Sequence, residues 1–360
     1  MGRRTPLTDI LLERIRRDGP LTFAAFMDAC LYHPEHGYYS QARSARGVGD
    51  YFTSPDVGPL FARLMLTQLR EMWDALGRPP RFDLVECGSG RGRLAGQLLS
   101  APQFTGQFAQ AARLTLVETS STLRAEVAAN VGSKTVVADT LPRVGVVGCI
   151  FSNELLDALP VHRVVQRGAG LSEIYISAAG DELREVEAEL SSPALVDYMK
   201  KYGAPLEEGQ FAEINLKALE WLAKAAAALE RGFLLTIDYG YRARELYGPA
   251  HRRGTLLAYR QHRAEENWLE APGEQDLTSH VNFTALEQRG HELGLTTLGL
   301  VPQSSFLLSL VRASGIEQMD AAARRQLIQL IHPEGMGETF KVLIQAKNVT
   351  SAALTGLAPL

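Results

Sequence analysis

Glu86-Cys87-Gly88-Ser89-Gly90-Arg91-Gly92 is a glycine-rich turn that directly follows the apolar run Phe82–Val85 and precedes a helix-like segment starting at Arg93. An apolar run, a turn and a periodic segment in succession predict a strand, a turn and a helix. Alternating glycines let the backbone of such a turn approach a ligand closely, because no side chain blocks the way. An ordinary glycine-rich corner without a ligand is the alternative interpretation at this point.

The spacing of these glycines excludes two common nucleotide-binding motifs. The dinucleotide fingerprint G-x-G-x-x-G would need a glycine where the chain has Arg93. A phosphate-binding loop would need G-K-[ST], which does not follow. An acidic residue at the strand end, here Glu86, followed by alternating glycines suits a ligand with a cationic amino-acid part and a nucleoside. S-adenosylmethionine is the obvious candidate for this cofactor.

The composition of the chain limits the partners and the cellular compartment that we expect for it. The chain has 360 residues, of which 46% are hydrophobic and 22% charged, as in ordinary globular proteins. A net charge of −4 predicts no nucleic-acid partner, and no apolar stretch is long enough to predict membrane insertion. Cys30, Cys87 and Cys149 lack the spacing of a disulfide framework or a zinc site. We therefore expect no metal and a reducing, cytoplasmic location.

The part of the chain before the glycine-rich turn is predicted to be helical. Leu7–Ile15 carries apolar residues at helical spacing, and a second helix is expected from Thr22 to just before His33. A third helix is expected from Pro55 onward. We assign residues 1–80 to a helical N-terminal region that packs on the core.

From residue 82 onward, the pattern changes to strands that alternate with helices. Most of the predicted strands are continuous apolar runs, as expected for parallel strands covered on both faces. The predicted strands are Phe82–Glu86, Leu114–Glu118, Thr135–Ala138, Val146–Phe151, Phe233–Asp238, Leu295–Val301 and Phe340–Lys347. This succession predicts a doubly wound α/β fold with an open sheet.

The fourth and fifth strands are separated by about 80 residues, more than one crossover helix requires. Val161–Val186 has the β-rich alternation of a small hairpin or cap, and Gln210–Arg231 is predicted to be a helix closed by Gly232. The predicted organisation is therefore an inserted substrate-side segment at 161–231, a core at 81–160 and 232–348, and a tail at 349–360.

Polar residues follow five of the predicted strands. In open α/β sheets, ligands bind beyond the carboxyl ends of the strands, so these residues are candidates for a binding site. They are Glu86, Glu118, Asp139, Asn153 and Asp238. Five such strand ends favour a nucleotide-type cofactor more strongly than the glycine-rich turn does alone.

Six segments of the chain resemble, in the same order, segments of the MidA-like methyltransferases, relatives of the mitochondrial assembly factor of respiratory complex I. The similarity extends from about Leu7 to Lys347. The segments are G-D-Y-F-T-S-P at Gly49–Pro55, E-C-G-S-G-R-G at Glu86–Gly92, N-E-L-L-D-A-L-P-V-H at Asn153–His162, D-Y-G-Y at Asp238–Tyr241, D-L-T-S-H-V-N-F at Asp276–Phe283 and M-G-E-T-F-K-V-L at Met336–Leu343.

This resemblance implies a Rossmann-like class I S-adenosylmethionine-dependent fold with a seven-stranded, mostly parallel sheet. It also implies methylation of a protein arginine, which is the activity of the mitochondrial member. The chain departs from the family at Cys87 and Ser89, where Leu and Pro are usual, and at Asn282, where an acidic residue is usual. If relatives use that carboxylate in catalysis, its role here is in doubt.

Ten residues are candidates for cofactor binding. Glu86 is expected to accept from the cofactor amino group, and Glu118 from both ribose hydroxyls, since a carboxylate can take several donors. The alternative role of Glu86 is to cap the next turn. The alternative role of Glu118 is that of an acid at the start of a helix, where the helix dipole favours it. Asp139 is assigned to the adenine amino group. The resemblance adds that Thr53–Pro55 closes over the cofactor, although helix capping alone would explain Ser54. The full set is Thr53, Ser54, Pro55, Glu86, Gly88, Gly90, Gly92, Glu118, Asp139 and Asn153.

Residues after the fourth strand are candidates for catalysis. Asn153 and Glu154 are expected to face the reacting methyl group. Glu154 and Asp157 are three positions apart, so on a helical turn they would share one face and could grip a guanidinium. Bracing of the following turn is the alternative role of Asp157. The candidate proton acceptors are His162, ranked first, and His262 and His280; Tyr239 and His280 are the candidate substrate-binding residues.

Three functions remain open from the sequence. The first is a protein arginine N-methyltransferase acting on a protein substrate. The second is a small-molecule O- or N-methyltransferase with His162 or His280 as the base. The third is a non-catalytic, cofactor-binding assembly factor. The sequence leaves a homodimer open in each case.

Overall fold

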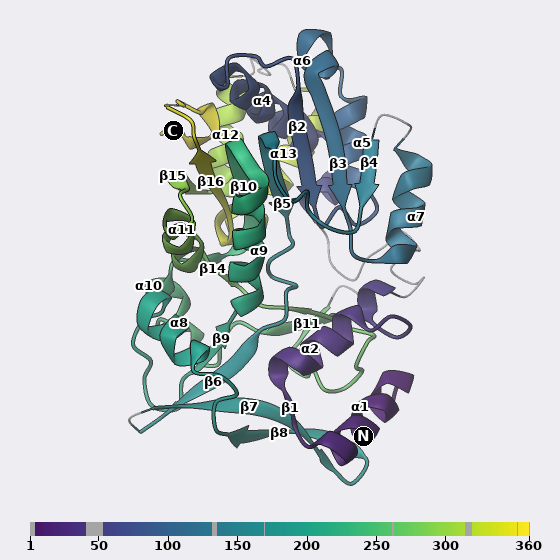
Figure 1. The fold of residues 1–360 in the computed structure, drawn as a ribbon, viewed down its shortest axis with the longest axis vertical. Coiled ribbons are helices and arrows are strands. Elements are labelled where there is room, and N and C mark those ends of the chain that lie inside the picture. The colour runs from purple at the N-terminus through teal and green to yellow at the C-terminus, as the bar shows by residue number, and fades with distance from the viewer. Residues whose placement is uncertain are drawn as a thin grey trace. The chain divides into compact units, whose positions relative to one another are not determined.

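The computed structural model describes residues 4–40, 53–131, 135–168, 170–260, 263–313, 319–350 and 352–359 (Figure 1). The chain forms two compact units, each assembled from separate stretches of sequence. The first unit comprises Met1–Tyr51, Leu156–Glu220 and Tyr241–Leu286, and the second comprises Phe52–Leu155, Trp221–Gly240 and Glu287–Leu360. Among the described residues, no helix is long and apolar enough to cross a membrane.

The second unit is built on a sheet whose strands follow the order β15-β16-β10-β5-β2-β3-β4. The central strands pair in parallel, whereas β16 is antiparallel to both of its neighbours. The main strands are β2 (Phe82–Cys87), β3 (Ala112–Val117), β4 (Thr135–Ala138), β5 (Val146–Asn153), β10 (Leu229–Tyr241), β15 (Thr296–Pro302) and β16 (Phe340–Lys347). This arrangement confirms the predicted Rossmann-like α/β fold.

Helices pack against this sheet and bury its central strands. Every residue of β2 is buried, which is the pattern of a parallel strand covered on both faces. Helix α4 contacts β5 and α5, and α7 lies beside β4 (Figure 1). The helices are α3 (Ser54–Val57), α4 (Pro59–Ala75), α5 (Arg93–Ser100), α6 (Gly106–Ala111), α7 (Ser121–Asn130), α9 (Leu216–Ala228), α11 (Phe283–Glu292), α12 (Gln303–Ala313) and α13 (Ala321–Ile331).

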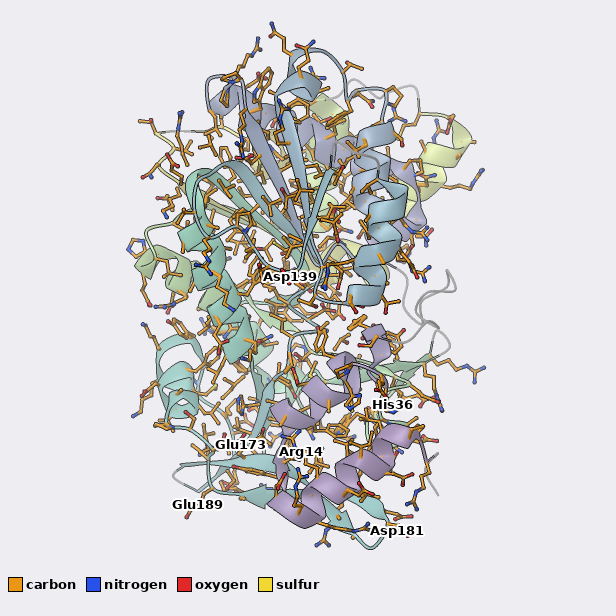
Figure 2. All side chains as sticks on the ribbon, turned by 45° about the vertical axis from the view of Figure 1, so that its right-hand side comes forward. Arg14, His36, Asp139, Glu173, Asp181 and Glu189 are labelled. Carbon is orange, nitrogen blue, oxygen red and sulfur yellow. The ribbon has the colours of Figure 1, made fainter. Side chains whose placement is uncertain are left out.

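The carboxyl ends of β2, β3 and β4 lie at one edge of the sheet, because these strands are parallel. Figure 2 shows Asp139 there, directly after β4. Glu118 follows β3, and the glycine-rich turn follows β2. The fold therefore brings these predicted strand-end residues to the same edge.

The first unit contains two smaller antiparallel sheets. One joins β1, β7, β6 and β9, with β8 paired to β7, and the other has the order β12-β11-β13. The elements are α1 (Pro6–Asp18), β1 (Leu21–Thr22), α2 (Phe23–Tyr32), β6 (His162–Arg167), β7 (Gly170–Ala179), β8 (Glu182–Ala188), α8 (Ala194–Tyr202), β9 (Phe211–Ile214), α10 (Ala243–Leu246), β11 (Leu257–Arg260), β12 (Arg263–Glu265) and β13 (Asp276–Thr278).

Helix α1 is fixed at its start by a cap and along its length by an apolar face. The Thr8 N–H donates to Thr5 Oγ1 at 3.2 Å, and the Thr5 N–H donates to Thr8 Oγ1 at 3.1 Å. Leu7, Leu11 and Ile15 recur at helical spacing and belong to the core that also contains α2. The apolar face predicted from the sequence therefore holds this helix in place.

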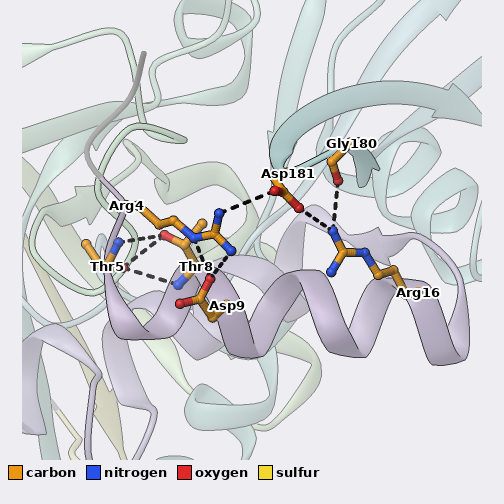
Figure 3. A network of polar contacts seen from close by, with 7 residues as sticks. All are labelled: Arg4, Thr5, Thr8, Asp9, Arg16, Gly180 and Asp181. Atoms are coloured by element: carbon orange, nitrogen blue, oxygen red, sulfur yellow. Dashed lines mark hydrogen bonds and ion pairs between the residues drawn. The ribbon is translucent and has the colours of Figure 1, made fainter.

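Ion pairs at the surface join α1 to the turn between β7 and β8 (Figure 3). Asp181 lies 2.7 Å from Arg16 and 3.5 Å from Arg4, and Arg16 also donates to the Gly180 carbonyl. These side chains are exposed, so water and salt weaken their attraction. The contacts orient the helix, whereas its buried face supplies the stability.

The helix predicted over Gln210–Arg231 was wrong at both ends. Residues Phe211–Ile214 form β9, the helix covers only Leu216–Ala228, and β10 begins at Leu229. The strand residues Phe211–Ile214 pair with β6, a contact between distant parts of the sequence that outweighs local helix propensity.

The boundaries of the two units differ from the predicted organisation. The N-terminal region predicted at 1–80 is divided, since residues up to Tyr51 belong to the first unit and α4 belongs to the second. The inserted segment predicted at 161–231 is divided too, between α9 residues Glu220 and Trp221. Helices α1 and α2 belong to the same unit as β7 of the inserted segment, because they pack against β7 and share its core.

Candidate functional site

The glycine-rich turn is tied to the end of β3 by hydrogen bonds. The N–H groups of Gly88 and Ser89 donate to the Val117 carbonyl at 2.9 and 3.2 Å. The Gly90 N–H donates to Glu118 Oε2 at 2.9 Å. The turn and the acidic residue predicted to bind ribose are therefore one connected structure.

The three glycines share left-handed backbone conformations but differ in what surrounds them. A Cβ on Gly88 would lie 2.8 Å from Leu155 Cδ1, and one on Gly92 would lie 3.2 Å from Val127 Cγ1. Gly90 has φ +53°, and a Cβ there would meet no described atom within 4 Å. Packing within the protein accounts for the first two glycines, whereas Gly90 borders open space.

Glu118 is buried and accepts a backbone hydrogen bond on each carboxylate oxygen. The Ser120 N–H donates to Oε1 at 2.9 Å, and the Gly90 N–H donates to Oε2. Burial raises the pKa of Glu118, and the N–H groups of Ser120 and Gly90 oppose the rise. Each oxygen keeps a further lone pair, so the carboxylate can bracket the turn and still accept from two ligand hydroxyls.

Glu86 is 4% exposed at the end of β2. Burial raises the pKa of Glu86 to about 8; the N–H of Ala95 in α5 lowers it, and the nearby Glu118 carboxylate raises it further. The contact with Ala95 supports the helix-capping role. A cation bound beside Glu86 would lower this pKa and so favour the charged carboxylate.

Among the buried polar atoms of the second unit that lack a hydrogen-bond partner within the described part of the chain, three lie at the ends of β2 and β5 or in the glycine-rich turn. They are Glu86 Oε2, Ser89 Oγ and Asn153 Oδ1. Buried polar groups without partners are costly and are rare in native proteins. These atoms, the carboxylate of Glu118 and the open space at Gly90 fit a ligand that carries an amino group and hydroxyls, as S-adenosylmethionine does.

Glu86→Gln is expected to remove one source of pH sensitivity. The folded-state pKa of Glu86, about 8, lies above its ordinary value of 4.5. Stability due to the neutral carboxyl is complete below pH 4.5 and is lost as the pH rises to 8, because the unfolded chain ionises first. The free energy of unfolding of the wild type should therefore fall relative to the variant across this range, by about 1.4 kcal/mol per unit of pKa shift at most.

Urea unfolding of both ligand-free proteins at a series of pH values measures this difference. The amide of the variant does not titrate, so groups that do not interact with Glu86 cancel in the comparison. A difference that stays constant from about pH 5 to 8 would show that Glu86 is not held as a neutral acid.

Glu154 directly follows β5 and has a strained backbone. Its φ of +54° is unusual for a residue with a side chain, and such conformations gather at functional sites. Its Oε1 accepts from the Ser54 N–H at 3.0 Å and from Asn153 Nδ2 at 2.8 Å. The Glu154 N–H donates to the Ile237 carbonyl of β10 at 2.9 Å. The carboxylate is thus held in one orientation by two donors.

The helical turn expected to align Glu154 with Asp157 was wrong. Glu154 is left-handed and the following residues form bends and a turn. Asp157 belongs to the first unit, where it is buried and its carbonyl accepts from the Ser279 N–H at 3.0 Å. The backbone contact agrees with a bracing role for this residue.

The segment Thr53–Pro55 is anchored to α5. Thr53 caps α3 together with Asp56, which accepts from the Thr53 N–H and hydroxyl at 3.0 and 2.6 Å. Arg93 lies 2.9 Å from Asp56, and Gln97 donates to the Pro55 carbonyl at 2.9 Å. Thr53 is therefore the capping residue of α3, and helix capping does not account for the Ser54 hydroxyl.

The remaining candidates of the second unit differ in exposure. Asp139 is exposed after β4, at the sheet edge shown in Figure 2. Tyr239 is buried within β10, with its ring centroid 5.2 Å from that of Phe340. Adenine binding by Asp139 and a substrate-wall role for Tyr239 stay predictions.

The candidate histidines lie in the first unit or outside the described residues. His162 is in β6, with Nδ1 2.7 Å from Glu173 Oε1. Burial lowers the pKa of His280 to about 4, and His251 adds to the effect, so His280 is neutral at pH 7. His262 lies outside the described residues. The structure thus places His162 and His280 in a different unit from the glycine-rich turn.

Asn282, where the family usually has an acid, has a structural role. Its Oδ1 accepts from the Ala285 N–H at 3.2 Å at the start of α11, and its Nδ2 donates to the Tyr202 carbonyl at 3.0 Å. A carboxylate could not donate this second hydrogen bond. The amide is therefore suited to its buried position.

Three further residues support the site: Asp238, which was predicted only as a polar strand end, and Asp56 and Gln303, which were not predicted. Asp238 Oδ2 accepts from the Leu155 N–H at 3.2 Å and so fixes the chain just after Glu154. Asp56 joins α3 to α5, and Gln303 accepts from the Ser54 hydroxyl at 3.2 Å. Only Asp238 left a signal in the sequence, as a polar strand end; the other two act through long-range contacts.

Comparison with known proteins identifies relatives over nearly the whole chain. A family model described as "Putative S-adenosyl-L-methionine-dependent methyltransferase" matches residues 64–301. A crystal structure from Burkholderia thailandensis with bound S-adenosyl-homocysteine is 28% identical, with a TM-score of 0.87, and the match covers 99% of this chain and 98% of that one. A native crystal structure from the same organism is 27% identical, with a TM-score of 0.86 and the same coverage of both chains.

Curated relatives carry a more specific name. "Protein arginine methyltransferase NDUFAF7, mitochondrial" of Mus musculus is 27% identical over 93% of this chain and 83% of its own length. The Drosophila melanogaster homolog is 27% identical over 96% of this chain and 85% of its own length. These matches agree with the resemblance found in the sequence.

Proposed function

Because the chain belongs to the S-adenosyl-L-methionine-dependent methyltransferase family whose model spans residues 64–301, we propose that it is a protein arginine N-methyltransferase. The names of its curated relatives support an arginine acceptor. The observation that carries the proposal is Glu154, a carboxylate held by two donors directly after β5. Such a fixed negative charge suits a guanidinium, which is positively charged at neutral pH.

The second unit supplies the cofactor site. S-adenosyl-L-methionine provides a methyl group on a positively charged sulfur. Glu86 Oε2 and Asn153 Oδ1 are suited to accept from its amino group, and Glu118 from its ribose hydroxyls. Gly90 leaves the space that these contacts require.

The role of Glu154 is to orient the acceptor and to take a proton. A protonated guanidinium nitrogen has no free lone pair, so it must lose a proton as its bond to the methyl carbon forms. Glu154 attracts the cation, aligns the nitrogen and accepts that proton. Ser54 and Asn153 keep the carboxylate in place, and this positioning lowers the barrier further.

A small-molecule methyltransferase is the second candidate. His162 lies 2.7 Å from Glu173, and a carboxylate beside an imidazole can orient it as a base. This pair belongs to the first unit, whereas the strand ends of the Rossmann-like sheet that carry the glycine-rich turn and Glu118 belong to the second. A cytoplasmic location and a homodimer stay predictions; the curated relatives carry the word mitochondrial in their names.

Glu118→Ala is expected to weaken cofactor affinity by about 1–3 kcal/mol, or roughly 5- to 150-fold. The change leaves the ribose hydroxyls without their acceptor and frees the Gly90 N–H. Calorimetric titration with S-adenosyl-homocysteine measures the loss, and circular dichroism checks that the variant is folded. Unchanged affinity in a folded variant would remove Glu118 from the site.

Radiolabelled S-adenosyl-L-methionine tests the acceptor class. The purified protein is incubated with cell lysate and labelled cofactor, and the protein-bound label is separated from the soluble label. We expect the label in the protein fraction. Label confined to small molecules would favour the second candidate, and no transfer with intact cofactor binding would favour a non-catalytic assembly factor.

A further inference from the structure

Ser54 connects the catalytic candidate Glu154 to a buried side chain far away in the sequence. The Ser54 N–H donates to Glu154 Oε1 at 3.0 Å, and the Ser54 hydroxyl donates to Gln303 Oε1 at 3.2 Å. All three residues belong to the second unit, and Ser54 and Gln303 are both 0% exposed. One residue therefore holds the carboxylate with its backbone and is itself held by its side chain.

Gln303 is fixed on both sides of its amide. Its Nε2 donates to the Leu330 carbonyl of α13 at 3.2 Å, which leaves Oε1 for the Ser54 hydroxyl. Met336 Sδ lies 3.8 Å from the same hydroxyl. A hydroxyl has one proton to donate, and a thioether is a weaker acceptor than an amide oxygen. The contact with Gln303 is therefore the stronger restraint on Ser54.

We propose that Gln303 is a positioning residue for Glu154 and acts through Ser54. This inference rests on the proposed function, in which Glu154 orients a guanidinium and accepts its proton. Loss of the Gln303 contact removes the restraint on the Ser54 side chain and leaves its hydroxyl only the weaker Met336 acceptor, so the start of α3 shifts. The Ser54 N–H moves with it, and Glu154 loses one of the two donors that fix its orientation.

The competing explanation is that Gln303 only stabilises α12 and α13. A purely structural residue would change the free energy of unfolding without a selective effect on turnover. Gln68 offers a matched comparison, because it is also 0% exposed and lies in the second unit. Its Oε1 accepts from the Gly356 N–H and its Nε2 donates to Glu71, both at 3.0 Å.

The test compares Gln303→Leu with Gln68→Leu. Both changes replace a buried amide with an apolar side chain of similar size. We expect Gln303→Leu to lower kcat by about 10-fold or more, while affinity for S-adenosyl-homocysteine stays within a few-fold. Gln68→Leu is expected to lower the unfolding temperature and to keep kcat near the wild-type value. An equal kcat in the two variants would overturn the proposal.

A second variant keeps the test decisive if Gln303→Leu does not fold. Ser54→Ala removes the hydroxyl but keeps the backbone N–H, and it is expected to lower kcat to a similar degree. Both changes should have no further effect in a Glu154→Gln background, because they act through that carboxylate. A full additional loss in that background would overturn the coupling. If Glu154→Gln alone keeps normal turnover, the proposed role of Glu154 fails first, and that result is separate from the behaviour of Gln303→Leu.

Discussion

Gly90→Val abolishes detectable binding of S-adenosyl-homocysteine, with affinity at least about 100-fold below the wild type, if the glycine-rich turn is the cofactor site. A Cβ on Gly90 meets no described atom within 4 Å, so the new side chain occupies space that the protein leaves open. A loss of this size corresponds to about 2.7 kcal/mol of binding free energy. Calorimetric titration with the purified variant measures it.

Gly106→Val is the control for backbone strain. Gly106 also belongs to the second unit, has a φ of +66°, and has nothing within 4 Å of an added Cβ. Valine in a left-handed conformation costs stability at either position. We expect both variants to unfold at lower temperature, but only Gly90→Val to lose the ligand. Retained affinity in a folded Gly90→Val protein would move the cofactor site elsewhere.

Glu154→Gln lowers turnover by about 100-fold or more, while cofactor affinity stays within a few-fold. Glutamine keeps an oxygen that can accept from Ser54 and Asn153, so the change removes mainly the charge. A neutral side chain neither attracts a guanidinium nor takes its proton. The rate of label transfer to lysate protein at saturating cofactor measures turnover, and titration gives the cofactor affinity.

Asp157→Asn is the comparison for this second change. Asp157 lies three residues after Glu154, and its carbonyl accepts from the Ser279 N–H, which agrees with a bracing role. We expect it to reduce turnover less than Glu154→Gln does. Near-normal methyl transfer by Glu154→Gln would contradict the guanidinium model and leave a neutral nucleophile, and hence a small-molecule acceptor, as the better account.

The sheet of the second unit could be predicted because its strands carry their own signal. β16 was predicted with its observed bounds, Phe340–Lys347, and the expected strand at Phe82–Glu86 ends one residue short of β2. These strands are buried on both faces, so continuous apolar runs identify them without knowledge of their neighbours. The strand-end acids followed from the same pattern.

The contacts that complete the site could not be predicted in this way. Ser54 and Gln303 are 249 positions apart, and nothing in either local sequence indicates that their side chains meet. The left-handed backbone of Glu154 is imposed by contacts with β10, including the Ile237 carbonyl, so the expected helical turn was wrong. The strand Phe211–Ile214 was mistaken for helix because its pairing with β6 is also non-local.

Identification of the methylated residue tests the central claim most directly. Protein labelled from radioactive S-adenosyl-L-methionine by the wild type, with Glu154→Gln as the control, is hydrolysed in acid and its amino acids are separated. The account predicts that the label elutes as methylarginine and that the control contains little of it. Label in methyllysine, label released as methanol by mild base before the acid hydrolysis, or label only in soluble small molecules would contradict it.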